Sequence, residues 1–73
     1  MIGKVLKEIR IKNNIKQNEL AKKVGFAKNT ISQYELGKRK VEFDKVEKIA
    51  KACGYRIILY NDTTEEVIPL DIK

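Results

Sequence analysis

Apolar residues recur at helical spacing in four stretches of the chain and at alternating spacing in its last quarter. The helical stretches predict helices over about 2–13, 17–24, 27–36 and 44–53. The alternating part begins after Gly54. The expected fold class is therefore mainly α: four helices followed by a C-terminal β-hairpin.

The apolar stripes of the four predicted helices define the expected core. The first helix contributes Ile2, Val5, Leu6 and Ile9. The second contributes Leu20, Ala21 and Val24, and the third contributes Ile31, Tyr34 and Glu35 as its inward residues. The fourth contributes Phe43, Val46, Ile49, Ala50 and Cys53. Gly25 breaks the second helix with a tight turn and Gly37 stops the third, since glycine tolerates positive φ.

Residues 55–60 are β-branched and aromatic, 61–65 form a polar turn, and 66–72 read as a second strand. Pro69 lacks an N–H, which indicates an edge strand. Apolar side chains fall on both faces of this hairpin, and an isolated hairpin is at best marginally stable. We expect a second subunit to cover it, through Tyr55, Ile57, Ile58, Leu59, Tyr60, Ile68, Leu70 and Ile72. The alternative is a hairpin folded onto its own domain.

Positive charge is concentrated in the first half of the chain. Residues 1–40 hold eleven Lys or Arg and three Asp or Glu, a net charge of +8, whereas residues 41–73 have a net charge of −2. Such asymmetry suits a nucleic-acid surface, although a solvated lysine-rich surface would look similar.

Several classes of protein fit the composition poorly. One Cys and no His exclude an internal disulfide and the usual zinc sites, and we expect no cofactor. The sequence has no glycine-rich phosphate-binding loop and no clustered carboxylates on a predicted cleft, so an enzyme is not expected. The predicted positions of the Tyr residues leave no aromatic platform for RNA. No apolar stretch approaches the ~20 residues of a membrane span, and we expect a cytoplasmic protein.

The outward face of the third predicted helix is polar, and a basic run follows it. Lys28, Asn29, Ser32 and Gln33 occupy that face, and Lys38, Arg39 and Lys40 come directly after Gly37. A short polar helix, braced by a shorter one and followed by cations, is the form of a major-groove reader.

The chain resembles the phage repressor and Cro (XRE-type) family of lambda-repressor-like helix-turn-helix domains. The resemblance rests on Gln17, Glu19-Leu20-Ala21, Val24-Gly25, Thr30-Ile31-Ser32, Glu35 and Gly37-Lys38-Arg39, and it extends over roughly residues 2–54. It implies a DNA-binding domain over 1–54, followed by the hairpin over 55–73 in the same single domain. The strand directly after the fourth helix resembles the dimerisation strand of some helix-turn-helix antitoxins.

The resemblance implies a role for each polar residue of this region. Base contacts are expected from Ala27, Lys28, Asn29, Ser32 and Gln33. Phosphate contacts are expected from Gln17, Thr30, Lys38, Arg39 and Lys40. Arg10 and Glu35 are expected to form an ion pair between the first and third helices. The helix starts at Lys16, Ala27 and Glu42 lack the usual capping side chains, which lowers stability and favours a partner chain.

Two functions follow, and they overlap. The first is a transcriptional regulator, a repressor or autoregulator, that binds double-stranded DNA as a homodimer on a palindromic site. The second is an antitoxin that binds a toxin protein and represses its own operon. A controller of a restriction–modification system is a further possibility within the same family.

Overall fold

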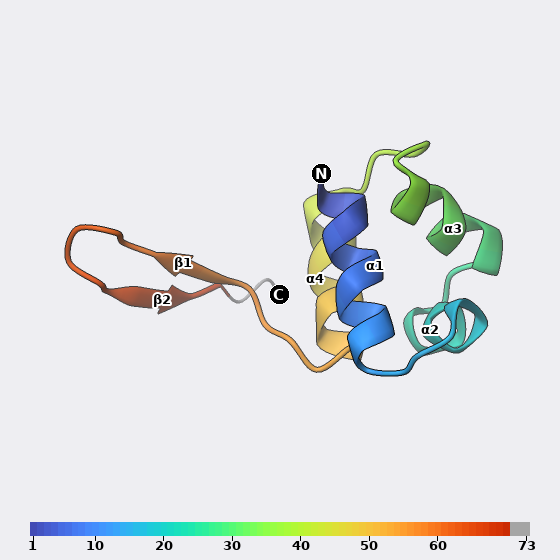
Figure 1. The fold of residues 1–73 in the computed structure, drawn as a ribbon, viewed down its shortest axis with the longest axis horizontal. Helices are drawn as coiled ribbons and strands as arrows, with labels where there is room; N and C mark the ends of the chain where they lie inside the picture. Colours follow the sequence, from blue (N-terminus) through green and yellow to red (C-terminus); the bar gives the residue numbers. More distant parts are fainter. Residues whose placement is uncertain (71–73) are drawn as a thin grey trace.

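The computed structural model describes residues 1–70 and shows four helices followed by a two-stranded antiparallel hairpin (Figure 1). The helices are α1 (Ile2–Lys12), α2 (Gln17–Val24), α3 (Lys28–Leu36) and α4 (Phe43–Ala52), and the strands are β1 (Ile58–Tyr60) and β2 (Val67–Pro69). The mainly α fold class predicted from the sequence is confirmed, and each helix begins and ends within one residue of its predicted bounds. No helix of the described part is long and apolar enough to cross a membrane.

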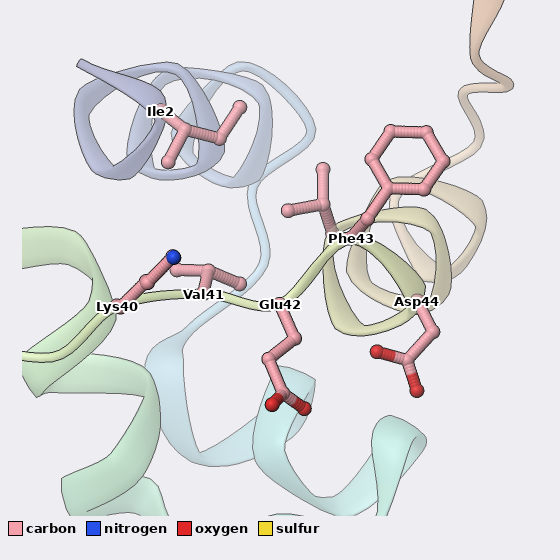
Figure 2. Close-up of a pocket in the computed structure, with 7 residues that line it drawn as sticks. Ile2, Lys40, Val41, Glu42, Phe43 and Asp44 are labelled. Atoms are coloured by element: carbon pink, nitrogen blue, oxygen red, sulfur yellow. The ribbon is translucent and has the colours of Figure 1, made fainter.

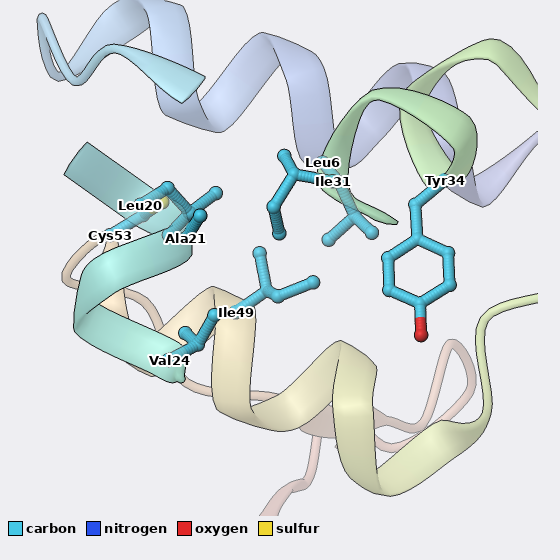
Figure 3. Packing of buried hydrophobic residues seen from close by; sticks show 8 residues of the cluster. All are labelled: Leu6, Leu20, Ala21, Val24, Ile31, Tyr34, Ile49 and Cys53. Atoms are coloured by element: carbon cyan, nitrogen blue, oxygen red, sulfur yellow. The ribbon is translucent and has the colours of Figure 1, made fainter. Parts of the chain in front are cut away.

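The core lies between the four helices. Leu20, Ile31 and Ile49 are its largest fully buried side chains, one from each of α2, α3 and α4. Around them the buried cluster is completed by Leu6, Ala21, Val24, Tyr34 and Cys53 (Figure 3). The core therefore fixes α3 from its inner side only, and its outer side faces solvent.

Three expected core residues lie at the surface instead. Ile2 is 45% exposed, Val5 is 48% exposed and Phe43 is 50% exposed. Helical spacing correctly placed them beside buried residues, but no element of the described chain covers that edge of α1 and α4. These side chains form an apolar surface along one edge of α1 and α4.

The helix ends follow the local chemistry of the sequence. Gly25 and Gly37 have φ values of 78° and 75°, and Asn14 takes the same left-handed region at 56°. The starts of α2, α3 and α4 have no side-chain capping bond to their first turn, as the residues Lys16, Ala27 and Glu42 predict. At the start of α2 a side chain of the first turn caps the backbone instead: the Lys16 N–H donates to Glu19 Oε1 at 2.9 Å.

Gly3 allows a close crossing of α1 and α3. A Cβ atom at this position would lie 2.2 Å from the carbonyl oxygen of Tyr34 and 3.2 Å from that of Glu35. These are backbone atoms of α3, so they cannot rotate away as a flexible side chain would. The glycine therefore sets how closely the first helix approaches the end of α3.

The hairpin projects away from the helices as a separate arm (Figure 1). Its strands pair in the register Ile58↔Pro69, Leu59↔Ile68 and Tyr60↔Val67, and all six residues are exposed. The first strand is shorter than the predicted 55–60, since β1 begins at Ile58, although the Leu70 N–H still donates to the Ile57 carbonyl at 2.9 Å. The second strand begins at Val67, one residue after the predicted start of 66–72, and residues 71–72 of that prediction lie outside the described residues. The expected contact residue Ile72 lies outside the described residues.

The hairpin turn is closed by its own hydrogen bonds. Asn61 Oδ1 accepts the N–H groups of Thr63 and Thr64 at 2.9 and 3.1 Å, and the Asn61 carbonyl accepts the Glu65 N–H at 2.7 Å. Glu65 adopts a positive φ of 63° to complete the turn. An asparagine that bonds its own following backbone stabilises such turns locally, so the sequence of the turn itself favours the observed pairing of the two strands.

Candidate nucleic-acid interface

A buried ion pair joins the first helix to α3. Arg10 Nε donates to Glu35 Oε2 at 2.6 Å, and Arg10 Nη2 donates to Glu35 Oε1 at 3.0 Å. Both residues are more than nine-tenths buried. Arg10 Nη1 also donates to the Ile15 carbonyl at 2.8 Å, which holds the loop before α2. Two parallel bonds in a fork fix orientation as well as distance, so the pair sets the rotation of α3 about its axis.

Gln17 extends this network to the second helix. Its Nε2 donates to Glu35 Oε1 at 3.0 Å, and its side chain is half-buried. The family resemblance predicts that Gln17 contacts a DNA phosphate. In the protein alone, its amide is bonded to Glu35. Because a primary amide carries two N–H donors, one donor remains beside the first turn of α2. One carboxylate thus connects three helices.

The outward side of α3 is available to a ligand. Lys28 and Asn29 are exposed, Ser32 and Gln33 are half-exposed, and Ala27 lies exposed at the N-cap position. All five expected base-contact residues therefore lie at the start or on the open side of the same helix. None of them shares in the core packing of Ile31 and Tyr34, which point to the other side.

A basic segment flanks the helix. Gly37 ends α3, and Lys38, Arg39 and Lys40 follow as exposed residues. Arg39 Nη1 donates to Thr30 Oγ1 at 3.2 Å, which brings the guanidinium back beside the first turn of α3. The structure therefore brings together Thr30 and Arg39, two of the residues expected to contact phosphate. Lys28 is the positive charge on the polar face itself, and the other cations lie beside that face, which suits a reader of a phosphate-lined groove.

Neither the contact of Gly3 with the backbone of α3 nor the bond from Gln17 to Glu35 was predicted from the sequence. A glycine inside a helix is unfavourable, so Gly3 was a usable signal of close packing. No local pattern signals the Gln17 bond, because its partner lies 18 residues away. Among residues 1–70, no group of three or more His, Cys, Asp or Glu could hold a metal ion.

Comparison with known proteins agrees with this geometry. A family model described as helix-turn-helix matches residues 6–59. The chain is 33% identical over 57 residues to the cryptic phage CTXphi transcriptional repressor RstR of Vibrio cholerae, an alignment that covers 78% of this chain and 51% of the relative. It is 38% identical over 55 residues to the control protein C.BamHI of Bacillus amyloliquefaciens, covering 74% of this chain and 68% of the relative.

The chain belongs to the XRE-type helix-turn-helix family, a family of DNA-binding transcription regulators. In this fold α2 and α3 are the two helices of the motif, and Gly25 lies in the turn between them. The chain spans about half the length of RstR and about two thirds of C.BamHI.

Proposed function

We propose that this protein regulates transcription by binding double-stranded DNA, with α3 in the major groove. The observation that carries the proposal is the open polar face of α3, held at a fixed rotation by the Arg10–Glu35 pair and flanked by exposed cations. The major groove admits one helix and presents a distinct pattern of donors and acceptors for each base pair.

The side chains divide into two roles. Lys28 suits guanine O6 and N7, and Gln33 and Asn29 suit adenine N6 and N7. Ala27 suits a thymine methyl group, and Ser32 accepts or donates according to its neighbour. Phosphate contacts come from Lys38, Arg39 and Lys40, from Thr30 beside Arg39, and from the second amide hydrogen of Gln17.

We further propose that the protein acts as a homodimer held together by its hairpins. Tyr55, Leu59, Tyr60 and Ile68 are each between 41% and 57% exposed, which is unusual for residues of this type in a small monomer. Ile57 and Leu70 at the base of the arm are half-buried and complete its apolar residues. A two-fold dimer would present two α3 helices about 34 Å apart, one turn of DNA, to a palindromic site.

The test is binding to the DNA upstream of the protein's own gene, measured by fluorescence anisotropy against a random duplex of equal length. We expect a preference for the upstream DNA that Lys28→Ala and Gln33→Ala each reduce by about 1–3 kcal/mol. Lys7→Ala is the matched control, because it removes one exposed lysine from α1, which contributes none of the proposed DNA contacts. Equal binding to both duplexes by the unmodified protein would refute sequence-specific regulation.

An antitoxin is the second candidate, supported by the exposed arm after α4. Under this proposal the apolar hairpin binds a toxin protein and the helix-turn-helix represses the shared operon. The two relatives favour the first candidate, since one is named a transcriptional repressor and the other a control protein. A gene adjacent to this one whose product is toxic alone and co-purifies with the protein would reverse that preference.

A further inference from the structure

An apolar groove lies between the N-terminal ends of α1 and α4, beside the proposed DNA surface, with which it shares only Lys40 among the residues that line it. Its volume is about 650 Å³, and we call it the α1/α4 groove. It is lined by the side chains of Ile2, Val41, Phe43 and Val46, with Lys40, Glu42 and Asp44 at its margin. Val5, at helical spacing from Ile2, continues the apolar surface along α1.

The floor of this groove is formed by apolar side chains, and the Lys40 nitrogen lies at its edge beside Val41 (Figure 2). Figure 2 shows the side chains of Ile2, Val41 and Phe43 turned toward the space between the two helices. The carboxylates of Glu42 and Asp44 point to the opposite side of the segment. Phe43 is half-exposed although it begins a helix whose later residues Ile49 and Ala50 are buried. A surface of this kind is suited to an apolar chain segment.

The hairpin offers such a segment, because both of its faces are apolar. Residues directly opposite in an antiparallel pair share one face. Leu59 and Ile68 therefore lie on one face, together with Ile57 and Leu70 at the base. The other face carries Ile58, Tyr60, Val67 and Pro69. A two-stranded ribbon with two apolar faces requires an apolar neighbour on each side.

The hairpin does not cover the groove of its own chain. It leaves the helices after the C-terminal end of α4, whereas the groove lies at the N-terminal ends of α1 and α4 (Figure 1). The hairpin segment is linked to the helices at its base, where Asn13 Nδ2 donates to the Tyr55 hydroxyl at 3.3 Å and the Tyr55 N–H donates to the Ala50 carbonyl at 2.9 Å. Both apolar surfaces are consequently left open in one copy.

The chain exposes more surface than a compact monomer of its size. Its accessible surface is 5464 Å², whereas a compact monomer of 8.4 kDa is expected to expose about 4600 Å². The projecting hairpin contributes to this difference, because all residues of its two strands are exposed. A second copy that covered the hairpin would remove apolar surface of both chains from water.

We propose that the α1/α4 groove receives the hairpin of a second copy of this chain, and that the exchange is reciprocal. This inference rests on the proposed homodimer and specifies how it is built. One face of each arm lies on the partner's groove, and the other faces of the two arms meet at the two-fold axis. Each chain carries one arm and one groove, so the assembly closes at two copies.

A mixing experiment tests the exchange without DNA. Phe43→Glu places a charge in the groove, and glutamate is compatible with the first position of a helix. Leu59→Lys places the opposite charge on the arm. We expect each variant alone to raise the dimer dissociation constant at least about thirty-fold by sedimentation equilibrium, as for an interface hot spot. An equimolar mixture should recover dimers, because the mixed dimer has one unmodified contact of arm and groove and one contact in which the two introduced charges are opposite in sign.

The control is Ile11→Glu, which adds the same charge to an α1 residue that is 53% exposed and points away from Ile2 by helical spacing. It should leave the dissociation constant unchanged. Circular dichroism and thermal unfolding of each variant verify the helical fold, and Phe43→Ala and Ile68→Lys serve as the second groove and arm variants.

Three outcomes overturn the inference, and they are distinct from failure of the DNA proposal. A dimer that Phe43→Glu and Phe43→Ala do not weaken would place the interface between the hairpins alone. Two weakened variants that stay monomeric when mixed would refute the exchange. A monomeric unmodified protein would refute every homodimer, while binding of the upstream DNA would still be decided by Lys28→Ala and Gln33→Ala.

Discussion

Arg10 Nε lies 2.6 Å from Glu35 Oε2, in a buried bond that spans 25 residues and joins α1 to α3. Glu35 also accepts the amide of Gln17, so the same carboxylate holds α2. The three helices that carry the proposed DNA contacts and their support therefore share one buried polar centre. Because its groups satisfy each other, removing one of them should cost more than removing the whole pair.

We predict that Arg10→Met lowers the free energy of unfolding by about 3–5 kcal/mol, since Glu35 is left as an unpaired buried charge. The double variant Arg10→Met/Glu35→Leu should recover most of this loss. Urea unfolding measures both. Lys12→Met is the control, because its ion pair with Glu8 is exposed and such pairs contribute at most about 1 kcal/mol. A double variant as unstable as the single one would contradict the argument.

We predict that Gly3→Ala destabilises the protein even though alanine is the better helix former by about 1 kcal/mol. The added methyl group would lie 2.2 Å from the Tyr34 carbonyl oxygen, and overpacking of this kind costs about 1–3 kcal/mol. Thermal unfolding should show a lower midpoint. Lys7→Ala, at an exposed position of the same helix, should raise the midpoint or leave it unchanged. An unchanged midpoint for Gly3→Ala would show that α1 can move away from α3 at no cost.

The helices and the turn chemistry were predictable from the sequence, because both depend on nearby residues. The spacing of Leu20, Ala21 and Val24 and the positions of Gly25 and Gly37 determine α2, α3 and the turn between them. The missing caps were predictable for the same reason. By contrast, the sequence placed Phe43 in the core, since a helical stripe indicates which residues share a face and not how far the neighbouring element extends over it.

The candidate site was predictable in composition but not in detail. The polar residues of α3 and the cations after it follow from the sequence pattern, and the Arg10–Glu35 pair was implied by the family resemblance. The bond from Gln17 to Glu35 and that from Arg39 to Thr30 depend on how the helices cross. Crossing geometry is set by core packing across distant segments, and no local pattern records it.

We predict that Arg39→Ala and Gln33→Ala affect DNA binding in different ways. Loss of a phosphate contact should weaken binding to all sequences and reduce the slope of log affinity against log salt by about 1. Loss of a base contact should reduce the difference in binding affinity between the upstream and random duplexes and leave the salt slope unchanged. Fluorescence anisotropy titrations at four salt concentrations measure both quantities. A reduced slope for Gln33→Ala would show that Gln33 contacts a phosphate and not a base.

We predict that Cys53 makes stability fall at high pH. Burial raises the pKa of the Cys53 thiol above its ordinary value of 9.0, and the positive charges of Lys23 and Arg10 offset part of that rise. The folded state therefore holds this proton more tightly than the unfolded state. The resulting stability is complete below pH 9 and is lost as the pH rises through the folded pKa.

The measurement is urea unfolding from pH 7 to pH 10.5 for the unmodified protein and for Cys53→Ala. All other side chains are common to both proteins, so the difference in stability between the two reports on the thiol. The stability advantage of the unmodified protein should shrink above pH 9. A constant difference across this range would show that burial of Cys53 does not alter its ionisation.

Pro69 determines how far the exposed arm can assemble. The bonds from Leu70 N–H to Ile57 and from Asn61 N–H to Glu66 alternate along the ribbon, so the Ile58–Pro69 pair has its backbone groups turned outward. At Pro69 no N–H is present there, and the outer edge of β2 is a poor template for another strand. A ribbon with one blunted edge cannot add strands indefinitely in both directions. The imino acid thus protects an apolar, edge-exposed segment from growing into fibres while leaving its faces free to bind.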